Sequence, residues 1–152
     1  MRIWIDADAT PRDVKEIVFR AAKRLELAVV LVANKRLDTP LGIPLVTAVQ
    51  VPGGADVADQ YIVDHASSGD LVVTQDIPLA ALLVPQGIVV LDPRGEEHTA
   101  ETIGERLSIR DLMESFRGAG VITGGPAPFH PRDKQAFASA LDRALTRMQK
   151  YR

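Results

Sequence analysis

Five aspartates could do chemistry together, because each lies where a strand is expected to end or a helix to begin. They are Asp6, Asp8, Asp56, Asp59 and Asp76. Two carboxylates about 4 Å apart repel by roughly 4 kcal/mol at an effective dielectric of about 20, so a cluster of them takes up protons or binds a cation. Oxygen ligands without histidine or cysteine suit Mg²⁺ or Mn²⁺. Such an ion activates a bound water and neutralises phosphate charge, which predicts phosphoester chemistry.

Each aspartate also has a structural explanation when it is considered alone. Asp56 and Asp76 stand at predicted helix starts, where a carboxylate can cap the helix and interact with its dipole. Asp8 could belong to the helix entry at Thr10. The predicted positions of these aspartates favour a shared site. Asp6 and Asp76 end parallel strands at one edge of the sheet, and Asp56 begins a helix that the chain enters from that edge. In open α/β sheets, ligands bind outside the carboxyl ends of the strands.

Basic residues near the predicted site are candidate substrate contacts. Lys35 and Arg36 follow the second predicted strand at the same edge, where they could meet a phosphate backbone. His130 and Arg132 flank the start of the last predicted helix, whose N-terminus could receive an anion. A solvated loop is the alternative explanation for Lys35 and Arg36, and a rigid connector is the alternative for the segment that contains His130 and Arg132.

Length, composition and charge limit the classes of protein. The 152 residues predict a single domain, 1–152, of ordinary soluble composition, with 46% hydrophobic and 25% charged residues. The net charge of -2 argues against tight non-specific nucleic-acid binding through bulk charge. The absence of cysteine excludes disulfides, thiolate metal sites and a cysteine nucleophile. No apolar run reaches 18 residues, so we expect a cytoplasmic protein without a membrane span.

Alternating strands and helices predict an α/β fold that would position the aspartates. Strands are expected at 3–5, 28–33, 45–51, 70–74 and 88–91, and helices at 11–26, 55–66, 77–83, 106–117 and 131–151. This order predicts a three-layer α/β/α sandwich with a mainly parallel, five-stranded sheet and no strand after Glu96. Thr10 is the expected N-cap of the first helix, with Pro11 at its first position. The last two helices would pack on the sheet, or one could serve a homodimer.

Four motifs spread over the chain carry a resemblance to a known family. They are Asp6-Ala7-Asp8-Ala9 with Pro11, Gly54-Ala55-Asp56-Val57-Ala58-Asp59, Val73-Thr74-Gln75-Asp76-Ile77-Pro78-Leu79-Ala80 and Gly124-Gly125-Pro126-Ala127-Pro128-Phe129. Together they resemble the YaiI/YqxD family (DUF188, or UPF0178), which is related to PIN-like and NYN nuclease domains. The resemblance implies a PIN-like fold, with Asp6, Asp56 and Asp76 as the metal cluster and Asp8 and Asp59 near it. The family usually has cysteine where Thr10 stands, so a role that needs a thiol is absent here.

The opening motif also resembles a different class of enzyme. Asp6-Xaa-Asp8-Xaa-Thr10 after an apolar strand is similar to the haloacid-dehalogenase phosphatase signature. That resemblance implies Asp6 as a nucleophile that forms an aspartyl-phosphate and Asp8 as a general acid and base. The later signatures fit poorly, because such enzymes need their acidic pair late in the chain, whereas Asp56 and Asp59 come early.

The leading hypothesis is a Mg²⁺- or Mn²⁺-dependent phosphodiesterase that acts on RNA, single-stranded rather than duplex. Asp6 and Asp76 would be direct metal ligands, Asp56 a direct or water-mediated one, and Asp8 and Asp59 outer groups. One alternative is a haloacid-dehalogenase-like phosphohydrolase with Asp6 as its nucleophile. The other is a non-catalytic domain that binds RNA or a protein partner and keeps only a vestigial acidic cluster.

Overall fold

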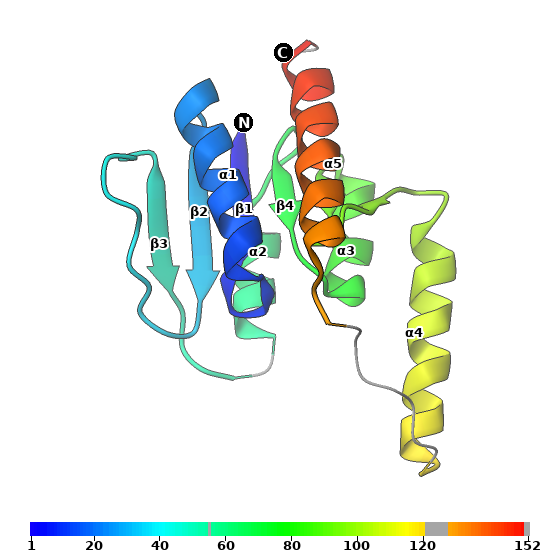
Figure 1. Ribbon diagram of the computed structural model, residues 1–152. Coiled ribbons are helices and arrows are strands. Elements are labelled where there is room, and N and C mark those ends of the chain that lie inside the picture. Colours follow the sequence, from blue (N-terminus) through cyan, green and yellow to red (C-terminus); the bar gives the residue numbers. More distant parts are fainter. Residues whose placement is uncertain (55, 121–127, 151–152) are drawn as a thin grey trace.

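A six-stranded sheet forms the centre of the molecule. The structure is a computed structural model that describes residues 1–54, 56–120 and 128–150 (Figure 1). The strands are β1 (Arg2–Asp6), β2 (Ala28–Ala33), β3 (Val46–Gln50), β4 (Leu71–Val73), β5 (Val89–Leu91) and β6 (Glu97–His98). Neighbouring strands follow the order β3-β2-β1-β4-β5-β6. The first five run parallel, and β6 pairs antiparallel with β5.

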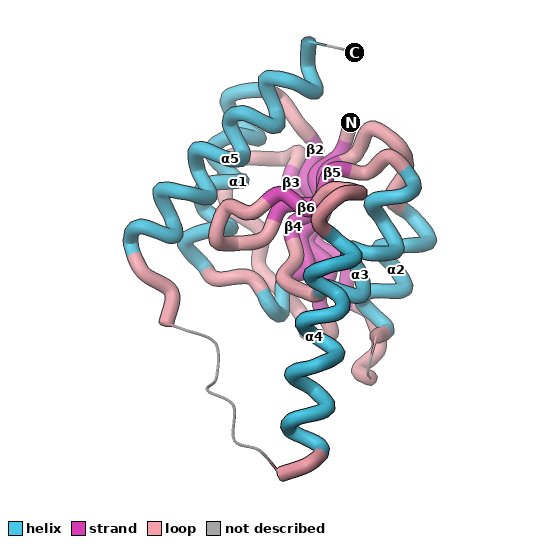
Figure 2. The backbone as a smooth tube through the Cα atoms, turned by 90° about the vertical axis from the view of Figure 1, so that its right-hand side faces the viewer, coloured by secondary structure: helices cyan, strands magenta, loops and turns pink. Residues whose placement is uncertain are grey.

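Helices cover both faces of this sheet. They are α1 (Arg12–Leu25), α2 (Val57–His65), α3 (Ile77–Leu83), α4 (Ile103–Gly118) and α5 (Pro131–Lys150). Figure 2 shows α1 and α5 on one side of the sheet and α2 and α3 on the other. Side chains of β1 alternate between two cores, so Ile3 and Ile5 pack with α1 and α5, whereas Trp4 packs with α2 and α3. None of the described helices is long and apolar enough to cross a membrane.

The predicted α/β class with a mainly parallel sheet is confirmed, but the sheet has one strand more than expected. The expectation that no strand follows Glu96 is wrong, because Glu97–His98 pairs with β5 across a tight turn. A two-residue edge strand carries no apolar run, so hydrophobic periodicity cannot reveal it. Three predicted details lie outside the described residues: the helix start at Ala55, the motif segment 124–127 and the helix end at Tyr151.

The order of the strands reverses at β1. The chain passes from β1 through α1 to β2 and then β3 on one side, and returns through α2 to β4 on the other side of β1. Asp6 ends β1, and Thr74 directly follows β4, so both stand at the carboxyl ends of these two neighbouring strands. In an open α/β sheet this reversal is the topological switch point, where a crevice forms that can receive a ligand.

The start of α1 differs from the prediction. Pro11 occupies the N-cap position and the helix begins at Arg12, without a hydrogen bond from a capping side chain. The predicted cap at Thr10 is therefore wrong, because its hydroxyl instead donates to the backbone oxygen of Asp6 at 2.7 Å. A 3-10 turn, Ala7–Ala9, lies between β1 and α1 and leaves Thr10 one residue too early to cap. Thr10 thus closes the loop that follows Asp6.

A single carboxylate joins three segments at the opposite end of the sheet. Asp70, directly before β4, is 6% exposed. It accepts hydrogen bonds of 3.0 Å from the backbone N–H of Arg2, from Nε1 of Trp4 and from the backbone N–H of Ser67. Because these donors belong to β1 and to the turn after α2, Asp70 is a structural residue that fixes β1 against β4.

Helix α4 extends away from the rest of the protein (Figures 1 and 2). The structure describes all 16 of its residues, and none of them is buried. Its contacts with the body are made mainly to α3. A stripe of exposed apolar side chains runs along it at helical spacing: Ile109, Leu112, Met113 and Phe116. Of the two helices expected to pack on the sheet, only α5 does so.

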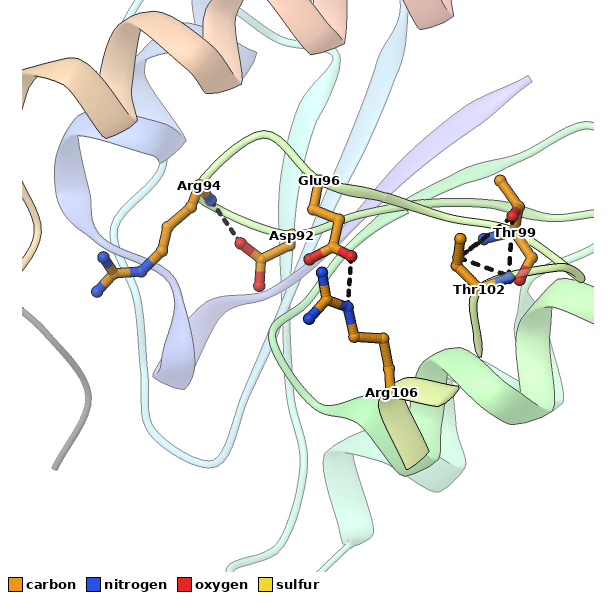
Figure 3. A network of polar contacts seen from close by, with 6 residues as sticks. All are labelled: Asp92, Arg94, Glu96, Thr99, Thr102 and Arg106. Atoms are coloured by element: carbon orange, nitrogen blue, oxygen red, sulfur yellow. Dashed lines mark hydrogen bonds and ion pairs between the residues drawn. The ribbon is translucent and has the colours of Figure 1, made fainter. Parts of the chain in front are cut away.

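The turn after β5 begins a polar network that leads to α4 (Figure 3). Two hydrogen bonds close the turn at Asp92. The backbone N–H of Arg94 donates to the side chain of Asp92, and the backbone N–H of Gly95 donates to the backbone oxygen of Asp92. Arg106 of α4 donates to Glu96 at 2.6 Å. His98 is buried, and neither of its ring nitrogens has a hydrogen-bond partner among the described residues. The network ties the start of α4 to the edge of the sheet.

Gly95 is required in this turn for two reasons, which predict a large effect of Gly95→Ala. Its φ is +94°, and an added Cβ would lie 2.6 Å from the backbone oxygen of Ala136 in α5. We expect a loss of about 2–4 kcal/mol in the free energy of unfolding, from backbone strain and from displacement of α5. Urea unfolding would measure it.

Gly42→Ala is the matched control for this variant. Gly42 has a φ of +81°, but an added Cβ there would meet nothing within 4 Å. Gly42→Ala should therefore show only the cost of the positive φ. Equal losses in the two variants would contradict the close approach of the turn to α5.

Candidate metal centre at the switch point

A threonine hydroxyl connects the two predicted ligands at the strand ends. Thr74, which is fully buried, donates from Oγ1 to Oδ2 of Asp6 at 3.1 Å. Oγ1 of Thr74 also accepts a hydrogen bond of 3.0 Å from the backbone N–H of Asp76. The carboxylate of Asp76 also caps α3, because Oδ1 accepts the backbone N–H of Leu79 at 2.9 Å. Thr74 therefore fixes the ends of β1 and β4 relative to each other, a role that the sequence alone does not reveal.

Asp59 reaches the same place from α2. The pKa of its carboxyl is raised from the ordinary 3.8 to about 7, first by burial and then by the charge of Asp76 and a hydrogen bond to Asp76. The charges of Asp6 and Asp56 act in the same direction. The structure thus brings together Asp6, Asp59 and Asp76, which we call the acidic cluster.

Asp8 and Asp56 lie at the border of the acidic cluster. Asp8 is exposed and accepts the backbone N–H of Asn34, after β2, at 2.8 Å. Asp56 occupies the N-cap position of α2 with a φ of +63°, and its side chain makes no capping hydrogen bond. Its carboxylate is exposed and close enough to affect Asp59. Asp56 and Asp59 both stand at the start of α2, and of the two it is Asp59 that hydrogen-bonds to Asp76.

Crowding of negative charge shows in the pKa of Asp6 as well. Burial raises the pKa of this carboxyl, the hydrogen bond from Thr74 lowers it, and the charges of Asp76 and Asp8 raise it again. No member of the acidic cluster forms an ion pair within the part of the chain that the structure describes. The cluster is therefore a site of uncompensated negative charge.

The donor atoms of the acidic cluster fit a hard divalent cation. All are carboxylate oxygens, which Mg²⁺ and Mn²⁺ prefer over nitrogen or sulfur. Within the described residues, however, no three His, Asp or Glu side chains are arranged to hold a metal ion. Asp59 and Asp76 instead share a hydrogen bond. Cation binding would require these carboxylates to turn.

A small hollow adjoins the acidic cluster between α2 and α3. Its volume is about 230 Å³, and its wall includes Asp56 and Asp59 from α2 and Pro78 and Leu82 from α3. Leu82 is 57% exposed. The hollow offers apolar surface directly beside carboxylates, an arrangement that can contact both the uncharged and the charged part of a ligand.

The predicted basic residues fall into two groups in space. Lys35 and Arg36 follow β2 at the carboxyl edge of the sheet and are exposed. Lys35 lies near Lys15 of α1, whose pKa is lowered by burial and by Lys35 and raised by Asp8. No sequence signal distinguishes Lys15 from the other charged residues of α1.

His130 and Arg132 make a separate surface at the start of α5. With Pro131 they line a hollow of about 250 Å³. The backbone N–H of His130 donates to Asp133, which also binds Arg94 at 3.2 Å. Within the described residues, neither His130 nor Arg132 contacts the acidic cluster.

The pKa of Asp59 predicts how stability changes with pH. A carboxyl whose folded-state pKa is raised from 3.8 to about 7 stabilises the fold fully below about pH 4, and this contribution is lost as the pH rises to about 7. The Asp59→Asn variant removes the titration and keeps an amide donor for Asp76. We expect it to melt at a higher temperature than the wild type at about pH 8, with a gain that shrinks toward zero near pH 4.

Asp64→Asn is the control on the same helix. Asp64 is exposed and binds Gln60 outside the acidic cluster. It should show no gain that grows with pH. A gain of the same size for Asp59→Asn at every pH would show that carboxylate crowding is not its cause.

Comparisons with known proteins find relatives along almost the whole chain. A family model described as the uncharacterised YaiI/YqxD family matches residues 4–147, a span that contains all five aspartates. A UPF0178 protein of Bordetella petrii is 59% identical over 145 residues, which are 95% of this chain and 96% of that protein. UPF0178 proteins of Myxococcus xanthus and Trichlorobacter lovleyi are 55% and 57% identical over 150 residues, 99% of this chain and 97% of each relative. No solved structure matches the chain.

Proposed function

This chain belongs to the YaiI/YqxD family, and we propose that it is a Mg²⁺- or Mn²⁺-dependent phosphodiesterase that acts on single-stranded RNA. The observation that carries the proposal is the convergence of Asp6, Asp59 and Asp76 at the switch point of the sheet. Burying carboxylates together costs free energy unless protons or a cation neutralise them. Their position at the place where α/β sheets bind ligands favours a cation-dependent function.

The residues of the site would have distinct roles in such an enzyme. Asp6, Asp59 and Asp76 would hold the cation, with Asp8 and Asp56 beside them, and Thr74 would keep Asp6 and Asp76 in register. When bound, the ion supplies Lewis acidity, which makes a water nucleophilic near neutral pH and offsets charge on a phosphate.

Positive charge beside the acidic cluster would orient the substrate. Lys15 and Lys35 lie near Asp8 at the carboxyl edge of the sheet. Contacts from lysine to phosphate oxygens position a nucleic acid without reading its sequence. This fits a phosphodiesterase with little sequence preference.

The test is cleavage of an end-labelled, single-stranded oligoribonucleotide by the purified protein. We expect shortened products with Mn²⁺ or Mg²⁺ and none with EDTA, separated by denaturing gel electrophoresis. Calorimetric titration with Mn²⁺ defines the concentration that saturates the protein. Absence of cleavage at that concentration, or equal cleavage in EDTA, would overturn the proposal.

A further inference from the structure

A groove with a volume of about 440 Å³ runs between α1 and α5. Figure 1 shows the two helices side by side on the face of the sheet that α2 and α3 do not cover. Apolar side chains of both helices line its floor: Ile17, Ala21, Ala138, Leu141 and Leu145. Basic side chains also line it, Arg20 and Arg24 from α1 and Lys134 from α5. We call this surface the α1/α5 groove.

The positive charge of the α1/α5 groove is poorly compensated. Neither Arg20 nor Lys134 forms an ion pair with any residue that the structure describes. Arg24 lies 3.9 Å from Asp142, but their side chains are 63% and 73% exposed, and such a surface pair contributes at most about 1 kcal/mol. Three cations therefore face one carboxylate, in a chain whose net charge is -2. This local excess of positive charge suits an anionic ligand.

The arrangement of the basic groups favours phosphates of an extended strand. Arg20 and Arg24 are four residues apart, roughly 6 Å along α1, and Lys134 stands on the facing helix. The planar guanidinium group binds phosphate oxygens in pairs. The volume of about 440 Å³ lies within the roughly 300–1,000 Å³ of small-ligand sites, so the groove can take a short piece of a single strand.

We propose that the α1/α5 groove binds the phosphodiester backbone of single-stranded RNA through Arg20, Arg24 and Lys134. The apolar floor would contact the sugars and bases between these phosphates. The choice of RNA as the occupant rests on the proposed function, whereas the affinity for phosphates rests on the groove alone. Because the α1/α5 groove lies on the opposite helical layer from the acidic cluster, binding there requires no divalent ion.

The experiment measures binding of a fluorescent, single-stranded oligouridylate in EDTA at several salt concentrations, by fluorescence anisotropy. The test variant is Arg20→Gln with Lys134→Gln. The control is Lys23→Gln with Arg143→Gln, which removes the same charge from exposed positions of α1 and α5 outside the groove. Each phosphate contact with a single strand contributes about 0.7 to the slope of log affinity against log salt. We expect the test variant to bind roughly tenfold more weakly, with a slope smaller by about 1.4.

The outcomes of this experiment test binding in the α1/α5 groove independently of RNA cleavage. Equal weakening in the test and control variants, or no binding by the wild type in EDTA, would overturn the proposal. Competition by polyglutamate as effective as competition by unlabelled oligouridylate would assign the groove to an acidic peptide instead. Binding that depends on the groove while no RNA is cleaved with any divalent ion would leave the groove proposal standing and refute the phosphodiesterase.

Discussion

The Asp6→Asn variant is expected to lose Mn²⁺-dependent RNA cleavage by at least about a hundredfold while it remains folded. Loss of a group that only supports a metal ligand typically costs about 10–100-fold, so loss of a direct ligand costs at least the upper value. The fold should tolerate the change, because the amide oxygen can still accept the hydroxyl of Thr74. Burial already raises the pKa of Asp6, so a neutral group at this position also relieves charge crowding.

Cleavage rates and urea unfolding, measured on the same preparations, would test this expectation. The control is Asp64→Asn, an exposed aspartate of α2 that should keep wild-type activity. Identical purification of the variants also excludes a contaminating ribonuclease, since a contaminant would cut equally in all of them. Cleavage by Asp6→Asn at the wild-type rate would remove Asp6 from the site.

The Asp70→Ala variant should be among the most destabilised single substitutions, with a loss of about 3–5 kcal/mol in the free energy of unfolding. The change removes one buried acceptor and leaves three donors, on Arg2, Trp4 and Ser67, without their partner. A hydrogen bond to a charged group contributes about 1.5–3 kcal/mol, and an unsatisfied buried donor adds its desolvation cost. Urea unfolding followed through the fluorescence of Trp4, the single tryptophan, provides the measurement.

Asp70→Asn separates the charge of this residue from its hydrogen bonds. Asparagine keeps one acceptor oxygen of similar geometry, so we expect a loss smaller than that of the alanine variant. If Asp70→Ala cost less than about 1 kcal/mol, water would have to replace the carboxylate in satisfying these donors.

Apolar patterning predicted the bounds of the elements that pack against the core with most of their side chains. The bounds of β2 and α3 match the expectation, because a fully buried parallel strand is apolar throughout and Pro78 marks the first turn of the helix. The edge strand β6 was not predicted, because two residue pairs with β5 and a tight turn suffice to form it. The local pattern of apolar residues cannot predict a strand pairing in which no run of apolar side chains is buried.

The sequence predicts which aspartates lie near one another, but not the contacts that they make. Strand order places Asp6 and Asp76 together, and the alternation of strands and helices contains that information. The turn of α2 that directs Asp59 toward Asp76 depends on how α2 packs against α3, and on the left-handed backbone of Asp56. The position of Lys15 near Lys35 and Asp8 likewise depends on tertiary packing, which the residue pattern of α1 does not contain.

The exposure of α4 has a consequence for the dynamics of the chain. A 16-residue helix is near the length at which isolated helices are only marginally stable in water, and α4 adds no buried side chain to hold it. Its amide hydrogens should therefore exchange with solvent through local opening, at a free energy well below that of global unfolding. Those of β1, paired on both sides within the sheet, should exchange only when the whole protein unfolds. The chain thus combines a cooperative sheet domain with a helical arm that can melt and re-form on its own.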